Sequence, residues 1–201
     1  NREMSLVNSI NADQGYVTSI SFHPSGDYMA SVGEQGIVKF WSVGDWKFIR
    51  SINTSGHDDH RMVISFSPDG IYLACVAHNN AQNCIKVYLT EDLKCITNLP
   101  ATYNTTCSIS ISHDSKYVAT SCMSGTVLVA QLNNGNIVKH KRYIIRYVCY
   151  TFAHFSPDSK YLAVATGTNI CLIHVENWDS EISLDQEHYK NILSLSFSPD
   201  G

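Results

Sequence analysis

The densest group of potential metal ligands in the chain is the tetrapeptide His57-Asp58-Asp59-His60. Imidazole nitrogens and carboxylate oxygens both bind zinc, and two His separated by two residues can chelate one ion. His57 also has a structural explanation, because it belongs to a Gly-His pair of the repeat described below. The two Asp are then explained as capping or solvent-exposed residues of a loop. The sequence therefore predicts no metal site.

A single basic run could bind phosphate groups. It contains four cations within KHKRYIIR: Lys139, Lys141, Arg142 and Arg146. With Tyr143 and Tyr147 nearby, this run could contact nucleic acid, a phosphoinositide or an acidic peptide. Lys and Arg on an outer strand also discourage edge-to-edge aggregation. We favour this second interpretation. The formal net charge of -4 argues against a chain built mainly to neutralise phosphates, although it does not exclude a local basic patch.

Catalytic signatures are missing from the sequence. No Ser-His-Asp order, Gly-rich phosphate loop, Cys-His pair or paired-carboxylate motif stands out. The seven Cys form no Cys-x-x-Cys pair, and most lie in apolar runs where a reduced Cys acts as a small hydrophobe. No apolar run reaches the roughly 18 residues that span a membrane. The sequence therefore predicts a non-enzyme without cofactor or membrane span, in the reducing cytoplasm or nucleus.

The elements that would position these residues come from an internal repeat. The segment SFSPDGIYLA at 65–74 has close copies at 21–30, 110–119 and 154–163, and a further copy begins at Ser196. One Tyr recurs every 44 or 45 residues, at Tyr28, Tyr72, Tyr117 and Tyr161. One Pro marks the turn before it, at Pro24, Pro68, Pro157 and Pro199, with His113 in the third copy.

Each repeat divides into four short strand-like runs. In the first copy the second run is Tyr28–Val32 and the third is Ile37–Trp41, with a Pro- and Gly-containing turn before the Tyr. Four strands in about 44 residues, with short turns and no helical pattern, predict one antiparallel blade. A lone four-stranded sheet is marginally stable, so blades must stack face to face. The predicted fold is an all-β propeller of four-stranded blades.

These repeats resemble WD repeats. The resemblance is carried by Gly56-His57, by SFSPDG at 65–70 and by G-x-V-K-x-W at Gly36–Trp41. It implies a closed ring, most often of seven blades, so we expect the ring to continue beyond both ends of this chain. The expected units are an outer strand of a preceding blade at 1–12, blades at 13–54, 55–100, 101–143 and 144–186, and the start of a further blade at 187–201.

The resemblance also implies a hydrogen-bonded network of His, Ser, Asp and Trp across each blade. The first blade keeps Ser31 and Trp41, the second keeps His57, and His188 is another His of the Gly-His type. In the fourth blade residue counting places His174 at the Trp position. No blade has the complete set, so the network is only partly formed.

The second blade is longer than the others. Its second strand is separated from the Trp position by three more residues, which fall in the polar segment AHNNAQN at 77–83. The sequence predicts a longer loop there. Longer loops on a rigid scaffold often carry binding residues, although neutral drift in loop length explains it equally well.

The resemblance implies a non-catalytic scaffold or adaptor that binds other proteins as a subunit of a complex. The expected docking face combines loops from each outer strand to the next inner strand with turns between second and third strands. Because Tyr and Arg are favoured interface anchors, the predicted binding residues are Arg61, Tyr103, Arg146, Tyr147 and Tyr189. The alternatives are a propeller attached to a hydrolase, and one that binds phosphoinositide or nucleic acid through the basic run.

Overall fold

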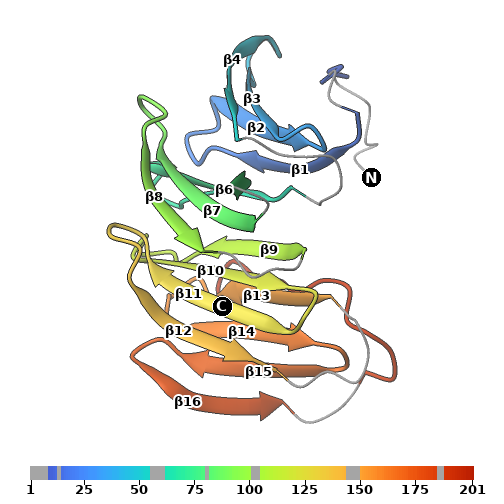
Figure 1. Ribbon diagram of the computed structural model, residues 1–201, viewed down its shortest axis with the longest axis vertical. Helices are drawn as coiled ribbons and strands as arrows, with labels where there is room; N and C mark the ends of the chain where they lie inside the picture. Colours follow the sequence, from blue (N-terminus) through green and yellow to red (C-terminus); the bar gives the residue numbers. More distant parts are fainter. Residues whose placement is uncertain are drawn as a thin grey trace.

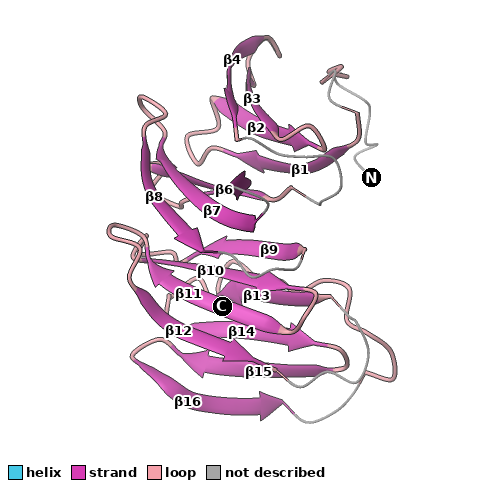
Figure 2. Cartoon of the chain, in the orientation of Figure 1, coloured by secondary structure: helices cyan, strands magenta, loops and turns pink. Residues whose placement is uncertain are grey.

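The computed structural model describes most of the chain and contains only β-strands as regular structure. The described residues are 9–12, 15–54, 62–79, 82–100, 105–143, 150–184 and 188–201. Within these ranges there are sixteen strands and no helix (Figure 2). The strands form four sheets of four strands each, which follow one another along the molecule (Figure 1). The predicted all-β propeller fold is confirmed.

The four sheets are four blades in chain order. Blades one and two contain β1 (Val17–Phe22), β2 (Tyr28–Gly33), β3 (Ile37–Ser42), β4 (Phe48–Asn53), β5 (Ile64–Phe66), β6 (Tyr72–Asn79), β7 (Gln82–Leu89) and β8 (Cys95–Pro100). Blades three and four contain β9 (Thr106–Ile111), β10 (Tyr117–Cys122), β11 (Thr126–Gln131), β12 (Ile137–Arg142), β13 (Thr151–Phe155), β14 (Tyr161–Thr166), β15 (Asn169–His174) and β16 (Asn177–Leu184).

Every blade is an antiparallel meander in which consecutive strands pair. Short turns allow this order, because antiparallel strands need no long crossover. The pairing of the third and fourth strands shifts register next to the third strand's end in all four blades, for example between Phe40 and Trp41. Such a bulge increases the local twist of the outer strand.

The hydrophobic core lies between the blades. One cluster of buried side chains runs through blades one to three and includes Phe40, Leu73 and Leu99, and a second joins blades three and four. The middle strands of blades two and three are mostly buried on both faces, because each of these blades has a neighbour on either side. This explains why the third strand of these repeats reads as a nearly continuous apolar run.

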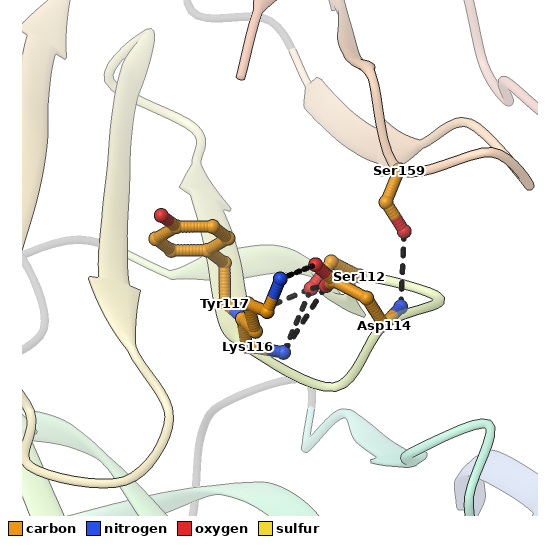
Figure 3. A network of polar contacts seen from close by, with 5 residues as sticks. All are labelled: Ser112, Asp114, Lys116, Tyr117 and Ser159. Atoms are coloured by element: carbon orange, nitrogen blue, oxygen red, sulfur yellow. Dashed lines mark hydrogen bonds and ion pairs between the residues drawn. The ribbon is translucent and has the colours of Figure 1, made fainter. Parts of the chain in front are cut away.

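The repeated turn between the first and second strands is held by a Ser–Asp pair, shown for blade three in Figure 3. The Ser112 hydroxyl donates to Asp114 Oδ1 (2.7 Å) and accepts the Tyr117 N–H (2.9 Å). Asp114 Oδ1 also accepts the Lys116 N–H (3.2 Å). Toward blade four, the Asp114 N–H donates to Ser159 Oγ (3.0 Å). The turn is therefore fixed internally and tied to the next blade.

Blades two and four repeat this arrangement. Ser67 donates to Asp69, and Ser156 donates to Asp158 (2.6 Å). The Pro residues of the repeat, Pro24, Pro68, Pro157 and Pro199, all lie in this turn. In blade one His23 replaces the Ser, and its Nδ1 lies 2.8 Å from Ser25 Oγ. The repeated SxSPDG-like motif of the sequence thus encodes one hydrogen-bonded turn.

Acid is expected to destabilise the blades through these carboxylates. Burial raises the pKa of Asp69 and of Asp114, but their hydrogen bonds from Ser and backbone N–H groups outweigh it, and the net pKa is lowered. For Asp158 the Ser156 hydroxyl lowers the pKa directly. Because the folded pKa lies below the unfolded value of about 3.9, the stabilisation is present above that pH. It is lost as the pH falls through the lower folded values.

Urea unfolding followed by circular dichroism checks this expectation. The unfolding midpoint should fall steeply below about pH 4. An Asp114→Asn variant should start less stable and lose less stability on acidification, because one of the three linked groups is gone. Equal acid sensitivity in variant and wild type would contradict the assignment.

Candidate functional site

Backbone hydrogen bonds define two opposite faces of the blades. On the first, which we call the loop face, loops entering the inner strands meet the turns between second and third strands. The bonds that join them are Glu34 N–H to Tyr16 O (3.3 Å), Met123 N–H to Thr105 O (3.0 Å) and Ile192 N–H to Gly167 O (2.7 Å). These are the two loop classes that the sequence assigned to one docking face.

The second face, which we call the turn face, carries the turns between first and second strands and those between third and fourth strands. The bonds that join them are Val43 N–H to Asp27 O, Thr90 N–H to Ile71 O, Leu132 N–H to Lys116 O and Val175 N–H to Lys160 O. The residues in each of these two columns occupy equivalent positions of the four blades.

Of the five predicted binding residues, only Tyr189 lies within the residues that the structure describes. Tyr189 lies on the loop face with its side chain fully exposed. Arg61, Tyr103, Arg146 and Tyr147 lie outside the described residues and remain predictions.

Tyr16 is a second candidate anchor on the loop face that the sequence did not single out. It is 78% exposed and directly precedes β1. Its position in a loop entering an inner strand was the available signal, since Tyr189 occupies the same kind of loop. Exposed Tyr side chains offer a large rigid contact area to a partner.

The structural positions of blade one come together as a buried pair. Trp41 Nε1 donates to Ser31 Oγ (2.8 Å), and both side chains are buried. In blade two Cys75 and Tyr88 occupy the same positions, and burial raises the pKa of the Cys75 thiol well above its usual range. His57 lies outside the described residues, and His188 is exposed. The cross-blade network is therefore retained locally and replaced by apolar packing in blade two.

Two sequence expectations are corrected by strand pairing. Ile173, rather than His174, occupies the Trp position of blade four, because Leu162 pairs with Ile173 as Met29 pairs with Trp41. The turn between β14 and β15 is one residue shorter than that between β2 and β3, which residue counting does not detect. The segment at 77–83 lies mostly within β6 and β7, whose pairing continues to Asn79 and Gln82. The additional residues extend a hairpin instead of forming a loop.

The basic run forms ion pairs with the next blade. Lys139 Nζ lies 2.8 Å from Asp179 Oδ1, and Lys141 pairs with Glu181. Lys141 Nζ also lies 4.6 Å from the centroid of the Tyr143 ring. Arg142 is exposed, whereas Arg146 lies outside the described residues. Two of the four cations thus have carboxylate partners within the protein.

One outer-strand position contacts the next blade at each of the three junctions, with different chemistry. Arg50 donates to the carbonyl oxygens of Glu91 (3.0 Å) and Thr90. Thr97 packs so closely on Gly135 that a Cβ there would lie 2.8 Å from Thr97 Cγ2. The third case is the Lys139 ion pair described above. Strand register shows that Arg50, Thr97 and Lys139 are equivalent.

Among the described residues, no His, Cys, Asp or Glu side chains gather in a group that could hold a metal ion. His57–His60 lies outside them. The cysteines of the described ranges are thiols, and burial raises the pKa of Cys84 and raises that of Cys171 to about 12. These two thiols are therefore protonated and unreactive at neutral pH. The same ranges contain no helix with the length and apolar character needed to cross a bilayer.

Comparison with known proteins supplies the remaining findings. The family described as WD domain, G-beta repeat, matches residues 4–42 and 93–129. The p21-activated protein kinase-interacting protein 1-like of Gallus gallus is 38% identical over 66 residues, which cover 32% of this chain and 16% of that protein. Protein HIR1 of Candida albicans is 26% identical over 225 residues, which cover 95% of this chain and 24% of that protein. The chain thus spans less than a quarter of either relative.

A solved structure has a similar fold. Hydrazine synthase of Kuenenia stuttgartiensis superposes with a TM-score of 0.68 at 17% sequence identity, over 87% of this chain and 55% of that one. At this identity the similarity concerns the arrangement of strands and not the activity.

Proposed function

Because this chain belongs to the WD-repeat family, whose members generally mediate contacts between proteins, we propose that it is a non-catalytic scaffold subunit of a multiprotein complex. Partner proteins bind through the loop face, by peptide segments or domains. Stacked blades hold these loops on a rigid frame, so little conformational entropy is lost on binding.

The observation that carries this proposal is the exposure of two Tyr on the loop face. Among the large hydrophobic residues of the described chain, Tyr16 and Tyr189 are the most exposed. Tyr16 directly precedes the inner strand of blade one, and Tyr189 lies in the segment that follows blade four. The two side chains therefore offer anchors near both ends of the row of blades. Arg61, Tyr103, Arg146 and Tyr147 complete the proposed surface from the loops between them.

Two further points support a protein partner over the alternatives. The name of the Gallus gallus relative describes an interaction with a protein kinase. The phosphate-binding alternative is weakened by the ion pairs of Lys139 and Lys141 with blade four. The cysteines of the described ranges are thiols, which supports a reducing location, and we place the protein in the cytoplasm or nucleus.

Removing the anchors of the loop face is expected to abolish partner capture without unfolding the blades. A Tyr16→Ser/Tyr189→Ser variant, and separately an Arg61→Ala/Arg146→Ala/Tyr147→Ala variant, should each lower recovery of specific partners about tenfold or more, as loss of interface anchors does. Recovery is measured by affinity capture and quantitative mass spectrometry. An Ile137→Ser variant, with an exposed apolar side chain on β12, serves as the control. If both loop-face variants captured the same partners as wild type, this face would not be the docking surface.

A further inference from the structure

A groove opens on the turn face between blades one and two, on the opposite side from the proposed loop-face site. Its volume is about 540 Å³. Tyr28, Phe40, Ile49 and Arg50 line it from blade one, and Ile71 and Glu91 are among the residues that line it from blade two. It is open to solvent on one side and has a mainly apolar wall.

Different side chains fill the first and the second junction. At the junction of blades two and three, Gly135 lets the turn pack directly on Thr97. At the first junction the Arg50 guanidinium lies between the blades, bonded to the Thr90 and Glu91 carbonyls and 5.3 Å from the centre of the Phe40 ring. A long side chain from blade one therefore reaches across to blade two at this position.

Hydrogen bonds and ring stacking fix the walls of the groove. Thr90 Oγ1, which is buried, donates to Gly70 O (2.6 Å), and His23 Nε2 lies 3.0 Å from the same carbonyl. His23 also stacks on Tyr28, with ring centroids 4.2 Å apart. The groove is thus formed before any partner arrives, which limits the entropy lost on binding.

Ile71 shows that this groove departs from the repeat. The equivalent positions of blades one, three and four hold Asp27, Lys116 and Lys160, which are charged. The fold therefore accepts a charged residue there, and an apolar side chain that is 49% exposed is not needed for the turn. Ile49, also 49% exposed, faces the same groove. The two Ile form an uncovered apolar wall.

The rim of the groove is acidic. Asp69 and Glu91 are exposed carboxylates in its lining, and Asp27 lies beside Tyr28. The Asp69 pKa is lowered, since hydrogen bonds to its carboxylate outweigh the effect of burial. The one cation in the lining, Arg50, is turned inward onto backbone carbonyls. A partner therefore meets negative charge around an apolar slot.

We propose that this groove binds a short basic segment of a partner protein. One aliphatic or aromatic side chain of the segment enters between Ile49 and Ile71, and flanking Lys or Arg side chains pair with Glu91 and Asp69. This binding site is separate from the loop face and would give the scaffold a second point of attachment.

Subtractive selection of peptides tests the proposal. A library of random dodecapeptides displayed on phage is first depleted on an Ile71→Lys variant and then selected on the wild-type chain. Lys stands at this position in blades three and four, so the variant should fold, and an Ile71→Ser variant is used in parallel. The recovered peptides are expected to share one apolar residue flanked by Lys or Arg. Synthetic copies should bind both variants about tenfold or more weakly than wild type.

Charge is tested with a matched pair of variants. Glu91→Gln should weaken the synthetic peptides, whereas Glu176→Gln, at the equivalent turn position of blade four, should not. The Tyr16→Ser/Tyr189→Ser variant should bind them as wild type does, so failure of the loop face leaves this result unaffected. The proposal is overturned if no peptide survives the depletion, if the survivors are acidic or lack an apolar residue, or if Glu91→Gln and Glu176→Gln behave alike.

Discussion

A Phe40→Ala variant is expected to lose about 3–5 kcal/mol of unfolding free energy, the range for removing a buried Phe. Phe40 has no exposed surface and lies at the junction of blades one and two. Its ring centroid is 6.3 Å from that of Phe66 and 6.4 Å from that of Tyr28, and the Arg50 guanidinium lies over it. Truncation therefore leaves a cavity between blades and removes the surface on which Arg50 rests.

Urea unfolding measures the loss, and Phe22→Ala provides a control of the same residue type. Phe22 is 54% exposed, so its truncation should cost about 1 kcal/mol. Equal costs for the two variants would show that the first junction is not a packed core. Because the clusters of buried side chains connect blades one to three, we expect Phe40→Ala to lower the unfolding midpoint of the chain as a whole.

Gly135→Ala is expected to cost about 2–4 kcal/mol, from backbone strain and overpacking together. Gly135 adopts φ +74, and an added Cβ would lie 2.8 Å from Thr97 Cγ2 and 3.1 Å from Leu99 Cδ2. The backbone conformation alone does not require Gly, since Trp46 and Leu93 adopt φ 57 at the equivalent turn positions. Gly is needed because blade two lies directly against this turn.

Two further variants separate strain from packing. Gly26→Ala has a similar φ of +78 but nothing within 4 Å of the added Cβ, so it should cost only about 1–2 kcal/mol. Adding Thr97→Ser to Gly135→Ala removes the methyl group in the way and should recover part of the stability. If Gly135→Ala cost no more than Gly26→Ala, the second junction would not be tightly packed. Both comparisons use urea unfolding midpoints.

The repeat was sufficient to predict the blades because each blade satisfies its hydrogen bonds locally. The Tyr column, the Pro-containing turn and the third-strand apolar run all lie within a few residues of their partners. Register was less predictable. His174 was placed one residue away from the true equivalent, Ile173, since a shortened turn leaves the strand pattern unchanged. The hairpin of β6 and β7 was missed because polar residues at 77–83 are as compatible with an exposed strand end as with a loop.

The contacts between blades could not be predicted from the sequence. Lys139 and Asp179 are 40 residues apart in the sequence and belong to different blades, and either charge alone is equally consistent with a solvated surface. The groove beside Ile71 is lined by residues of two blades, with Arg50 reaching from one blade to the other, and no local pattern encodes this arrangement. Tyr189 was predicted as an anchor from its loop and is exposed, whereas Tyr16, exposed in the same kind of loop, was not singled out. Exposure, unlike strand pattern, is a property of the assembled structure.

The unlike junctions at Arg50, Thr97 and Lys139 have a consequence for how the chain finds its fold. Tandem units of similar sequence can misassemble when a unit pairs with a copy that is not its neighbour. Here a blade stacked on the wrong copy would leave Lys139 without Asp179, which belongs to β16, or drive Arg50 into the turn at Gly135, where an added Cβ would lie 2.8 Å from Thr97 Cγ2. These unlike contacts are expected to favour the stacking of each blade on its own successor. The sequence differences among the repeats weaken the match to the family pattern. They also make the contacts between blades unlike one another, which favours one order of stacking.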